Sequence, residues 1–175
     1  MLVINLWAGP GAGKSTTAAG LFFKLKSNGV NSEYVQEYAK AVTWEKRVNL
    51  LSDQLYILAK QNRSLERLRN QVDVVVTDSP VLLGLNYTLP DYYPIHFKNF
   101  TREVWDSYTN LNFVIQREKV YQPIGRNQTE QQARELDQKI ITFLNDQDIP
   151  YTLVPGNTDA PDVIFKYVQE FLRSK

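Results

Sequence analysis

The chain has 175 residues, 43% hydrophobic and 22% charged, which suits one globular domain with a sizeable core and leaves little room for two. A formal net charge of +1 excludes a strong overall attraction to nucleic acid or to a membrane surface, although not a local basic patch. The lack of cysteine excludes disulfides and thiolate metal sites, and no apolar run approaches the roughly 20 residues that span a bilayer. We therefore expect a soluble cytoplasmic protein with no membrane partner.

The first half of the chain alternates apolar runs typical of strands with amphipathic stretches typical of helices. In chain order, these predict a strand over Leu2–Trp7, a helix over Ser15–Lys26, a strand over Ser32–Gln36 and a helix over Leu50–Arg69. The last of these helices is expected to bury one apolar stripe, made of Leu51, Leu55, Leu58 and Leu65.

The second half continues the alternation. The run VDVVVT at 72–77 is typical of a central strand, and Thr129 with Gln132 three residues later is close to a capping box at a helix start. The remaining elements are predicted as strands over Leu111–Gln116 and Ile149–Val154 and a closing helix over Pro161–Leu172. The order predicts an α/β fold, with a five-stranded parallel sheet and helices on both faces, in one domain over residues 1–175.

A glycine-rich segment joins the first expected strand to the first expected helix. It reads Ala8-Gly9-Pro10-Gly11-Ala12-Gly13-Lys14-Ser15-Thr16, a looser Walker A sequence with Ala8 in place of the usual first glycine. Such a loop turns backbone N–H groups toward an anion, and the helix after it adds its positive end. We therefore predict a P-loop NTPase domain in which Gly9 to Thr16 bind ATP, Lys14 neutralises the terminal phosphates and Ser15 ligates Mg²⁺. The alternative is a glycine-rich turn with an incidental lysine.

Two acidic residues follow expected strands, at the sheet edge where the glycine-rich loop also lies. Asp78 ends the run VDVVVT and is expected either to hold Mg²⁺ or to contact the acceptor, the alternative being a simple turn before Ser79-Pro80. Glu37 follows the second strand and is the candidate general base, unless it is a plain surface glutamate. Asp78 is followed by serine rather than by a glutamate that activates water, which favours transfer to a hydroxyl over hydrolysis.

Residues 117–128 are polar, contain proline and glycine (Gly125) and carry three cations. This pattern indicates a mobile basic lid that closes over the phosphates, with Arg117 and Arg126 stabilising the transferred charge. A solvated loop with ordinary charges is the alternative.

Three further features bear on the acceptor. Aromatic residues are concentrated in the segment 87–108, which also contains Pro90 and Pro94 as helix breakers; they either stack on a flat base or pack a small core of their own. Asp53 and Gln54 are candidates to recognise a base or ribose. The expected helix over Leu50–Arg69 also carries cations that form either a solvated face or a DNA contact, namely Lys60, Arg63 and Arg67.

Several short segments together resemble a known family: Gly-Pro-Gly-Ala-Gly-Lys-Ser, Gln-Glu-Tyr-Ala-Lys, Ser-Asp-Gln-Leu, Val-Val-Thr-Asp-Ser-Pro and Gly-Arg-Asn-Gln-Thr-Glu. The chain is similar to the nicotinamide-riboside-kinase-like P-loop kinases, often encoded by bacteriophages, which include nucleoside kinases and kinases of hydroxymethyluracil in phage DNA. The resemblance implies Glu37 and Asp78 at the active edge and Arg126 in the lid, and the host cytoplasm as location if the chain is phage-encoded.

The expected function is that of an ATP- and Mg²⁺-dependent kinase that phosphorylates a hydroxyl of a nucleoside, nucleotide or related small molecule. Two alternatives stay open: a DNA kinase that modifies a hydroxymethylated pyrimidine base, and a nucleotide-binding switch that hydrolyses slowly. Nothing in the sequence indicates an oligomeric state.

Overall fold

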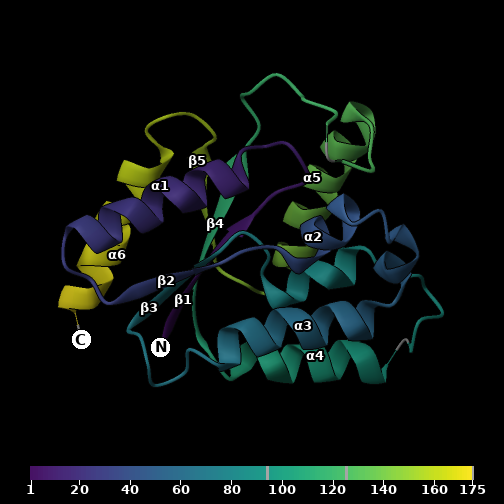
Figure 1. Cartoon of the computed structure of the whole chain (residues 1–175), viewed down its shortest axis with the longest axis horizontal. Helices are drawn as coiled ribbons and strands as arrows, with labels where there is room; N and C mark the ends of the chain where they lie inside the picture. Colours follow the sequence, from purple (N-terminus) through teal and green to yellow (C-terminus); the bar gives the residue numbers. More distant parts are fainter. Residues whose placement is uncertain (94, 125, 175) are drawn as a thin grey trace.

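The structure, a computed structural model, describes residues 1–93, 95–124 and 126–174, so Pro94 and Gly125 lie outside the described residues. The described chain forms one parallel sheet in the order β2-β3-β1-β4-β5 (Figure 1). Its strands are β1 (Leu2–Trp7), β2 (Ser32–Val35), β3 (Val74–Thr77), β4 (Thr109–Gln116) and β5 (Thr152–Pro155). The predicted five-stranded parallel sheet is therefore confirmed.

The helices in the described residues are α1 (Lys14–Ser27), α2 (Tyr38–Trp44), α3 (Gln54–Glu66), α4 (His96–Asp106), α5 (Glu130–Asp146) and α6 (Ala160–Arg173). Two short 3₁₀ helices, η1 (Val48–Ser52) and η2 (Val81–Asn86), complete the fold. The capping box expected at Thr129 and Gln132 is confirmed, with both reciprocal bonds present at the start of α5. Helices α2 and α4 were not predicted from the sequence.

The long helix predicted over Leu50–Arg69 is wrong in its first turn. Asp53 interrupts it, because its side chain accepts a hydrogen bond from the Tyr56 N–H at 3.1 Å and so caps α3. The inward face of α3 also differs from the predicted leucine stripe, since Leu55 is 46% exposed. The residues that α3 buries are Gln54, Leu58, Gln61 and Leu65.

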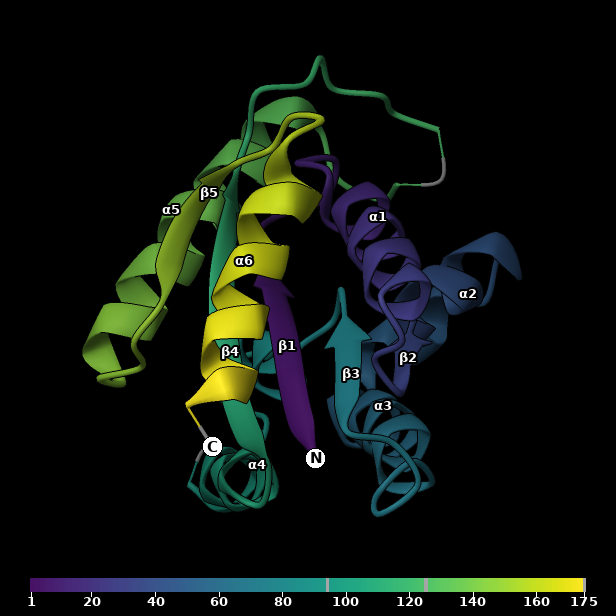
Figure 2. The ribbon, with the colours of Figure 1, turned by 90° about the vertical axis from the view of Figure 1, so that its left-hand side faces the viewer.

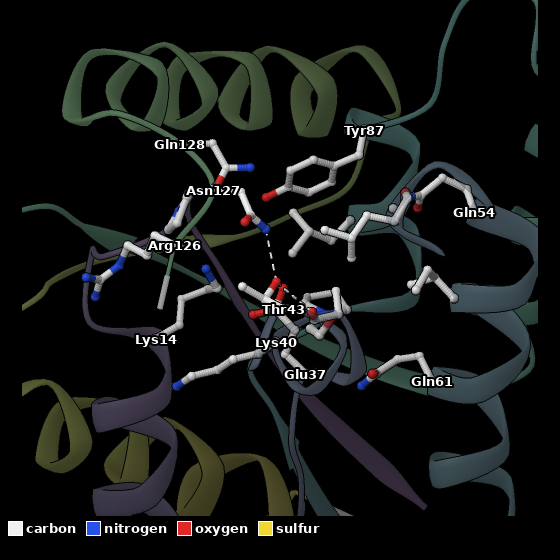
Figure 3. Close-up of a pocket in the computed structure, with 18 of the residues that line it drawn as sticks. Lys14, Glu37, Lys40, Thr43, Gln54, Gln61, Tyr87, Arg126, Asn127 and Gln128 are labelled. Atoms are coloured by element: carbon white, nitrogen blue, oxygen red, sulfur yellow. Dashed lines mark hydrogen bonds between the residues drawn. The ribbon is translucent and has the colours of Figure 1, made fainter. Parts of the chain in front are cut away.

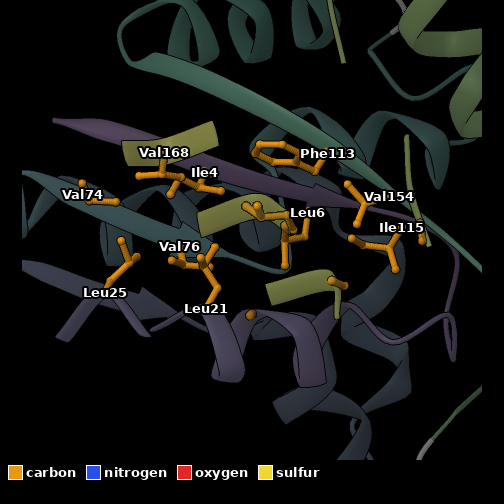
Figure 4. Close-up of a cluster of buried hydrophobic side chains, with 14 of the residues drawn as sticks. Ile4, Leu6, Leu21, Leu25, Val74, Val76, Phe113, Ile115, Val154 and Val168 are labelled. Atoms are coloured by element: carbon orange, nitrogen blue, oxygen red, sulfur yellow. The ribbon is translucent and has the colours of Figure 1, made fainter. Parts of the chain in front are cut away.

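Helices cover the sheet on both faces (Figure 2). On one face, α1 and α6 pack against the strands and bury an apolar cluster. The residues of it labelled in Figure 4 are Ile4, Leu6, Leu21, Leu25, Val74, Val76, Phe113, Ile115, Val154 and Val168. The other face packs against α3, α4, α5 and η2 around Trp7 and Trp105. The centroids of these two rings lie 5.6 Å apart in an edge-on arrangement. Burial on both faces explains why the central strands are almost continuous apolar runs.

The parallel arrangement gathers three chain segments at the carboxyl edge of the sheet. Thr77 at the end of β3 is paired with Asn5 in β1 on one side and with Val35 in β2 on the other. The residues that follow these strands therefore lie next to each other: the glycine-rich loop after β1, Asp78 after β3 and Glu37 after β2. None of the helices in the described part of the chain is long and apolar enough to cross a bilayer.

Candidate active site

A cavity of about 520 Å³ opens at this carboxyl edge (Figure 3). The glycine-rich loop and the start of α1 form one end of it, and α2 forms a side. The opposite wall comes from η1, α3, η2 and α4, and the segment 126–128 lies over the opening. The cavity thus brings together the regions that the sequence assigned to the nucleotide, the acceptor and the lid.

The glycine-rich loop has the backbone shape that an anion site requires. Gly11 and Gly13 have φ angles of 82° and 112°, in the left-handed region that favours glycine, and Gly13 directly precedes α1. The Lys14 ammonium lies inside the loop and donates to the carbonyl oxygens of Ala8 at 2.7 Å and Gly9 at 3.1 Å. Burial lowers the pKa of Lys14, while the carboxylates of Glu37 and Asp78 oppose this shift. Lys14 is therefore a desolvated cation at the start of a helix.

Asp78 is buried and connects the start of α1 to the segment that follows β2. Its Oδ2 accepts a hydrogen bond from the Ser15 hydroxyl at 2.5 Å, and its Oδ1 accepts one from the Glu37 N–H at 3.0 Å. A hydroxyl and a carboxylate in contact are the hard oxygen ligands that Mg²⁺ prefers. No group of three or more histidine, aspartate or glutamate side chains that could hold a metal ion occurs among the described residues.

Glu37 lies in the cavity wall immediately before α2. Burial, and next the neighbouring Asp78 carboxylate, raise the pKa of Glu37, while the cations Lys14 and Lys40 act in the opposite direction. Helix α2 is fixed to the core because the Tyr38 N–H donates to Oε1 of Gln61 at 3.0 Å. Glu37, the candidate base from the sequence, is thus half-buried, and its backbone is anchored through its own N–H and that of Tyr38.

The wall opposite the loop is apolar with two buried amides. Gln54 donates from Nε2 to the Leu51 carbonyl at 2.6 Å, and Gln61 donates from Nε2 to the Thr77 hydroxyl at 3.3 Å. The Tyr87 ring also lines the cavity (Figure 3). Asp53 does not, since it caps α3 and accepts a hydrogen bond from the Tyr92 hydroxyl at 3.1 Å.

In its described residues, the aromatic segment does not form a small core of its own. Trp105 and Tyr108 are buried in the main core beside the sheet, Phe97 belongs to that core and also lines the cavity, and Tyr87 lines the cavity. The cations Lys60 and Arg63 on α3, and Arg67 directly after it, are exposed and are not among the residues that line the cavity.

The two arginines predicted for the lid have different surroundings. Arg126 lines the cavity and lies over the Tyr121 ring at 5.3 Å, and its neighbour Asn127 donates to the Thr43 hydroxyl in α2 at 3.0 Å. Arg117 is instead buried beside the glycine-rich loop, in an ion pair with Asp137 of α5. Sequence reasoning did not identify Asp137 or Thr43, because neither belongs to a recognisable motif.

Comparison with protein families gives one finding that covers most of the chain. A family model described as "AAA domain" matches residues 3–161. This range includes the glycine-rich loop, Glu37, Asp78 and the segment 117–128. A comparison with curated proteins gives no match.

Proposed function

Since the chain belongs to the AAA-domain family of P-loop NTPases, we propose that it is a kinase that transfers the γ-phosphate of ATP to a hydroxyl group of a small acceptor. Such a family uses a bound nucleoside triphosphate for phosphoryl transfer or hydrolysis. One observation carries this proposal: the Glu37 carboxylate lies in a cavity that extends from the phosphate loop to an apolar wall. Such a cavity has room for a second substrate beside the nucleotide, which a hydrolytic enzyme does not need.

In the proposed reaction, the loop amides and Lys14 bind the phosphates, and Arg126 stabilises the charge of the transferred group. Ser15 and Asp78 would hold Mg²⁺, which neutralises the phosphate oxygens when bound. Glu37 accepts the proton of the acceptor hydroxyl as the bond from its oxygen to the γ-phosphorus forms. The bond between the γ-phosphorus and the bridging oxygen breaks, and ADP leaves.

The charges around the cavity favour an uncharged acceptor. Lys14, Lys40 and Arg126 lie on one side of it, and Gln54 and Gln61 on the other (Figure 3). Among the described residues, the wall from η1, α3, η2 and α4 has no charged side chain in the cavity. An acceptor that already carries a phosphate needs a cation near it, whereas a flat neutral base needs apolar walls and a few amides. We therefore favour a nucleoside over a nucleotide.

Transfer of radiolabelled γ-phosphate from ATP tests the proposal, with nucleosides, nucleoside monophosphates and hydroxymethylated DNA as acceptors. We expect labelled nucleoside product, little or no transfer to monophosphates, and no transfer with the Lys14→Ala variant. Label on DNA alone would favour the DNA kinase, in which case the product should disappear when Lys60, Arg63 and Arg67 are replaced by alanine. Release of free phosphate without any phosphorylated acceptor would favour the hydrolytic switch.

Replacing Asp78 with asparagine is expected to raise the Mg²⁺ concentration needed for half-maximal transfer by about tenfold or more. The amide still accepts a hydrogen bond from the Ser15 hydroxyl but carries no charge to attract the cation. The measurement is a Mg²⁺ titration of the transfer rate at fixed ATP. Asp73→Asn is a matched control, because Asp73 is an exposed carboxylate directly before the same strand, at the opposite end from the cavity. An unchanged titration for Asp78→Asn would remove Asp78 from the metal site.

A further inference from the structure

Asp137, two turns into α5, lies directly against the phosphate loop. Its Oδ1 accepts a hydrogen bond from the Gly9 N–H at 2.6 Å. The same carboxylate accepts from Nε of Arg117 at 2.8 Å and from Nη2 at 3.2 Å. One side chain thus connects the first turn of the loop to the residue that follows β4.

Position 9 has no room for a side chain. A Cβ atom there would lie 2.5 Å from the Ala133 carbonyl oxygen and 2.9 Å from Oδ1 of Asp137, both in α5. The Walker A pattern leaves this position open, so the phosphate does not dictate the glycine. Glycine is needed here because α5 packs directly against the loop backbone and brings the Asp137 carboxylate to the Gly9 N–H.

Arg117 holds the carboxylate from the other side. The Arg117 side chain is 4% exposed and that of Asp137 is 18% exposed, so this ion pair is shielded from solvent. Nη2 of Arg117 also approaches the Ala133 carbonyl at 3.5 Å. Arg117 is the first residue of the segment 117–128, and Asp137 belongs to α5, the helix that follows this segment. The ion pair therefore connects the start of the predicted lid to the helix after it, beside the glycine-rich loop.

We propose that Asp137 is a positioning residue for the phosphate loop and that Arg117 acts through Asp137. By holding the Gly9 N–H, Asp137 fixes the peptide whose neighbouring carbonyl groups, on Ala8 and Gly9, bind the Lys14 ammonium. The loop is thereby held in its phosphate-binding shape before a nucleotide arrives, which lowers the free-energy cost of binding. This role requires nucleotide binding alone and does not depend on the nature of the acceptor.

Single substitutions at this pair would mix two effects, because removing one partner leaves a buried charge uncompensated. Two double variants avoid this: Arg117→Met with Asp137→Asn, and Arg117→Met with Asp137→Leu. Both remove the two charges, and asparagine and leucine are similar in size. Only asparagine keeps an oxygen that accepts a hydrogen bond from the Gly9 N–H. The two variants therefore differ chiefly in that hydrogen bond.

The measurement is the Kd for ATP with Mg²⁺ by calorimetry, with the melting temperature of each variant as a check on folding. We expect the asparagine variant to bind ATP within about threefold of wild type and the leucine variant to bind about ten- to a hundredfold more weakly at a similar melting temperature. Equal affinities of the two variants would overturn the proposal.

The level of the two affinities then says what replaces it. If both variants bound ATP equally weakly, the guanidinium of Arg117 would itself be required, through Nη1, which has no hydrogen-bond partner among the described residues. Because affinity is measured without turnover, a protein that binds ATP but transfers no phosphate refutes the proposed kinase activity, while the two double variants still decide on the role of Asp137.

Discussion

Replacing Lys14 with alanine is expected to lower phosphoryl transfer by about 10³-fold or more, because the phosphates lose their main side-chain cation in a desolvated site. The protein should remain folded, since burial lowers the pKa of Lys14 and its charged form is therefore a cost to the folded state near neutral pH. Initial rates of γ-phosphate transfer, together with the melting temperature, test both parts of the prediction.

Lys24→Ala is the matched control for this experiment. Lys24 belongs to the same helix and forms an ion pair with Asp162 at 2.6 Å, away from the cavity. Its replacement should leave the transfer rate within about twofold of wild type, as for an ordinary surface position. Near wild-type turnover in a folded Lys14→Ala protein would contradict the assignment of the loop to phosphate binding.

Replacing Glu37 with glutamine should lower kcat by about 10²- to 10⁴-fold and leave the affinity for ATP nearly unchanged, because the amide cannot accept the acceptor's proton. The backbone N–H of residue 37 still donates to Asp78, so the geometry of the site is retained. The measurements are kcat under saturating substrates and the Kd for ATP. Normal turnover of Glu37→Gln, together with an inactive Asp78→Asn at every Mg²⁺ concentration, would exchange the roles of the two carboxyl groups.

The pH dependence of the same variant gives an independent readout. Since the pKa of Glu37 is raised, kcat of the wild type should increase with pH around an apparent pKa above 4.5, the ordinary pKa of a glutamate. In Glu37→Gln this fall of kcat at low pH should be absent.

The raised pKa of Glu37 has the opposite effect on stability. A carboxyl group with a raised pKa in the folded state binds more protons there than in the unfolded state, so the wild type loses stability as pH rises through this range. Glu37→Gln should therefore melt at a higher temperature than wild type at pH 7, and the difference should shrink towards pH 4.

The sequence predicted the sheet and the loop well because their signals are local. Continuous valine runs require burial on both faces, and the order of strands and helices leaves few ways to connect them. Glu37 and Asp78 could be placed at one edge for the same reason, since parallel strands end on the same side. The chemical role of each of these residues stays a prediction, which the kinetic measurements above test.

Other parts of the fold depend on contacts that no local pattern encodes. Helix α4 has no clear signal in the sequence, because Pro90 and Pro94 are typical helix breakers, yet α4 begins at His96, after both. The inward face of α3 differs from the predicted stripe because packing against the sheet and η2, not the local pattern, decides which residues it buries. Gln54, a candidate for acceptor recognition in the sequence, does line the cavity, whereas the second buried amide of that wall, Gln61, belongs to no motif and was not predicted.

The bonds made by Asp78 have a consequence for how the two proposed substrates affect each other's binding. Its two oxygens hold the Ser15 hydroxyl on the side proposed for the nucleotide and the Glu37 N–H on the side proposed for the acceptor. A ligand that draws Ser15 away from Asp78 therefore changes the group that anchors the start of α2. Such a connection makes the two affinities interdependent, and thermodynamic reciprocity then requires ATP to alter acceptor binding by the same factor as the acceptor alters the binding of ATP.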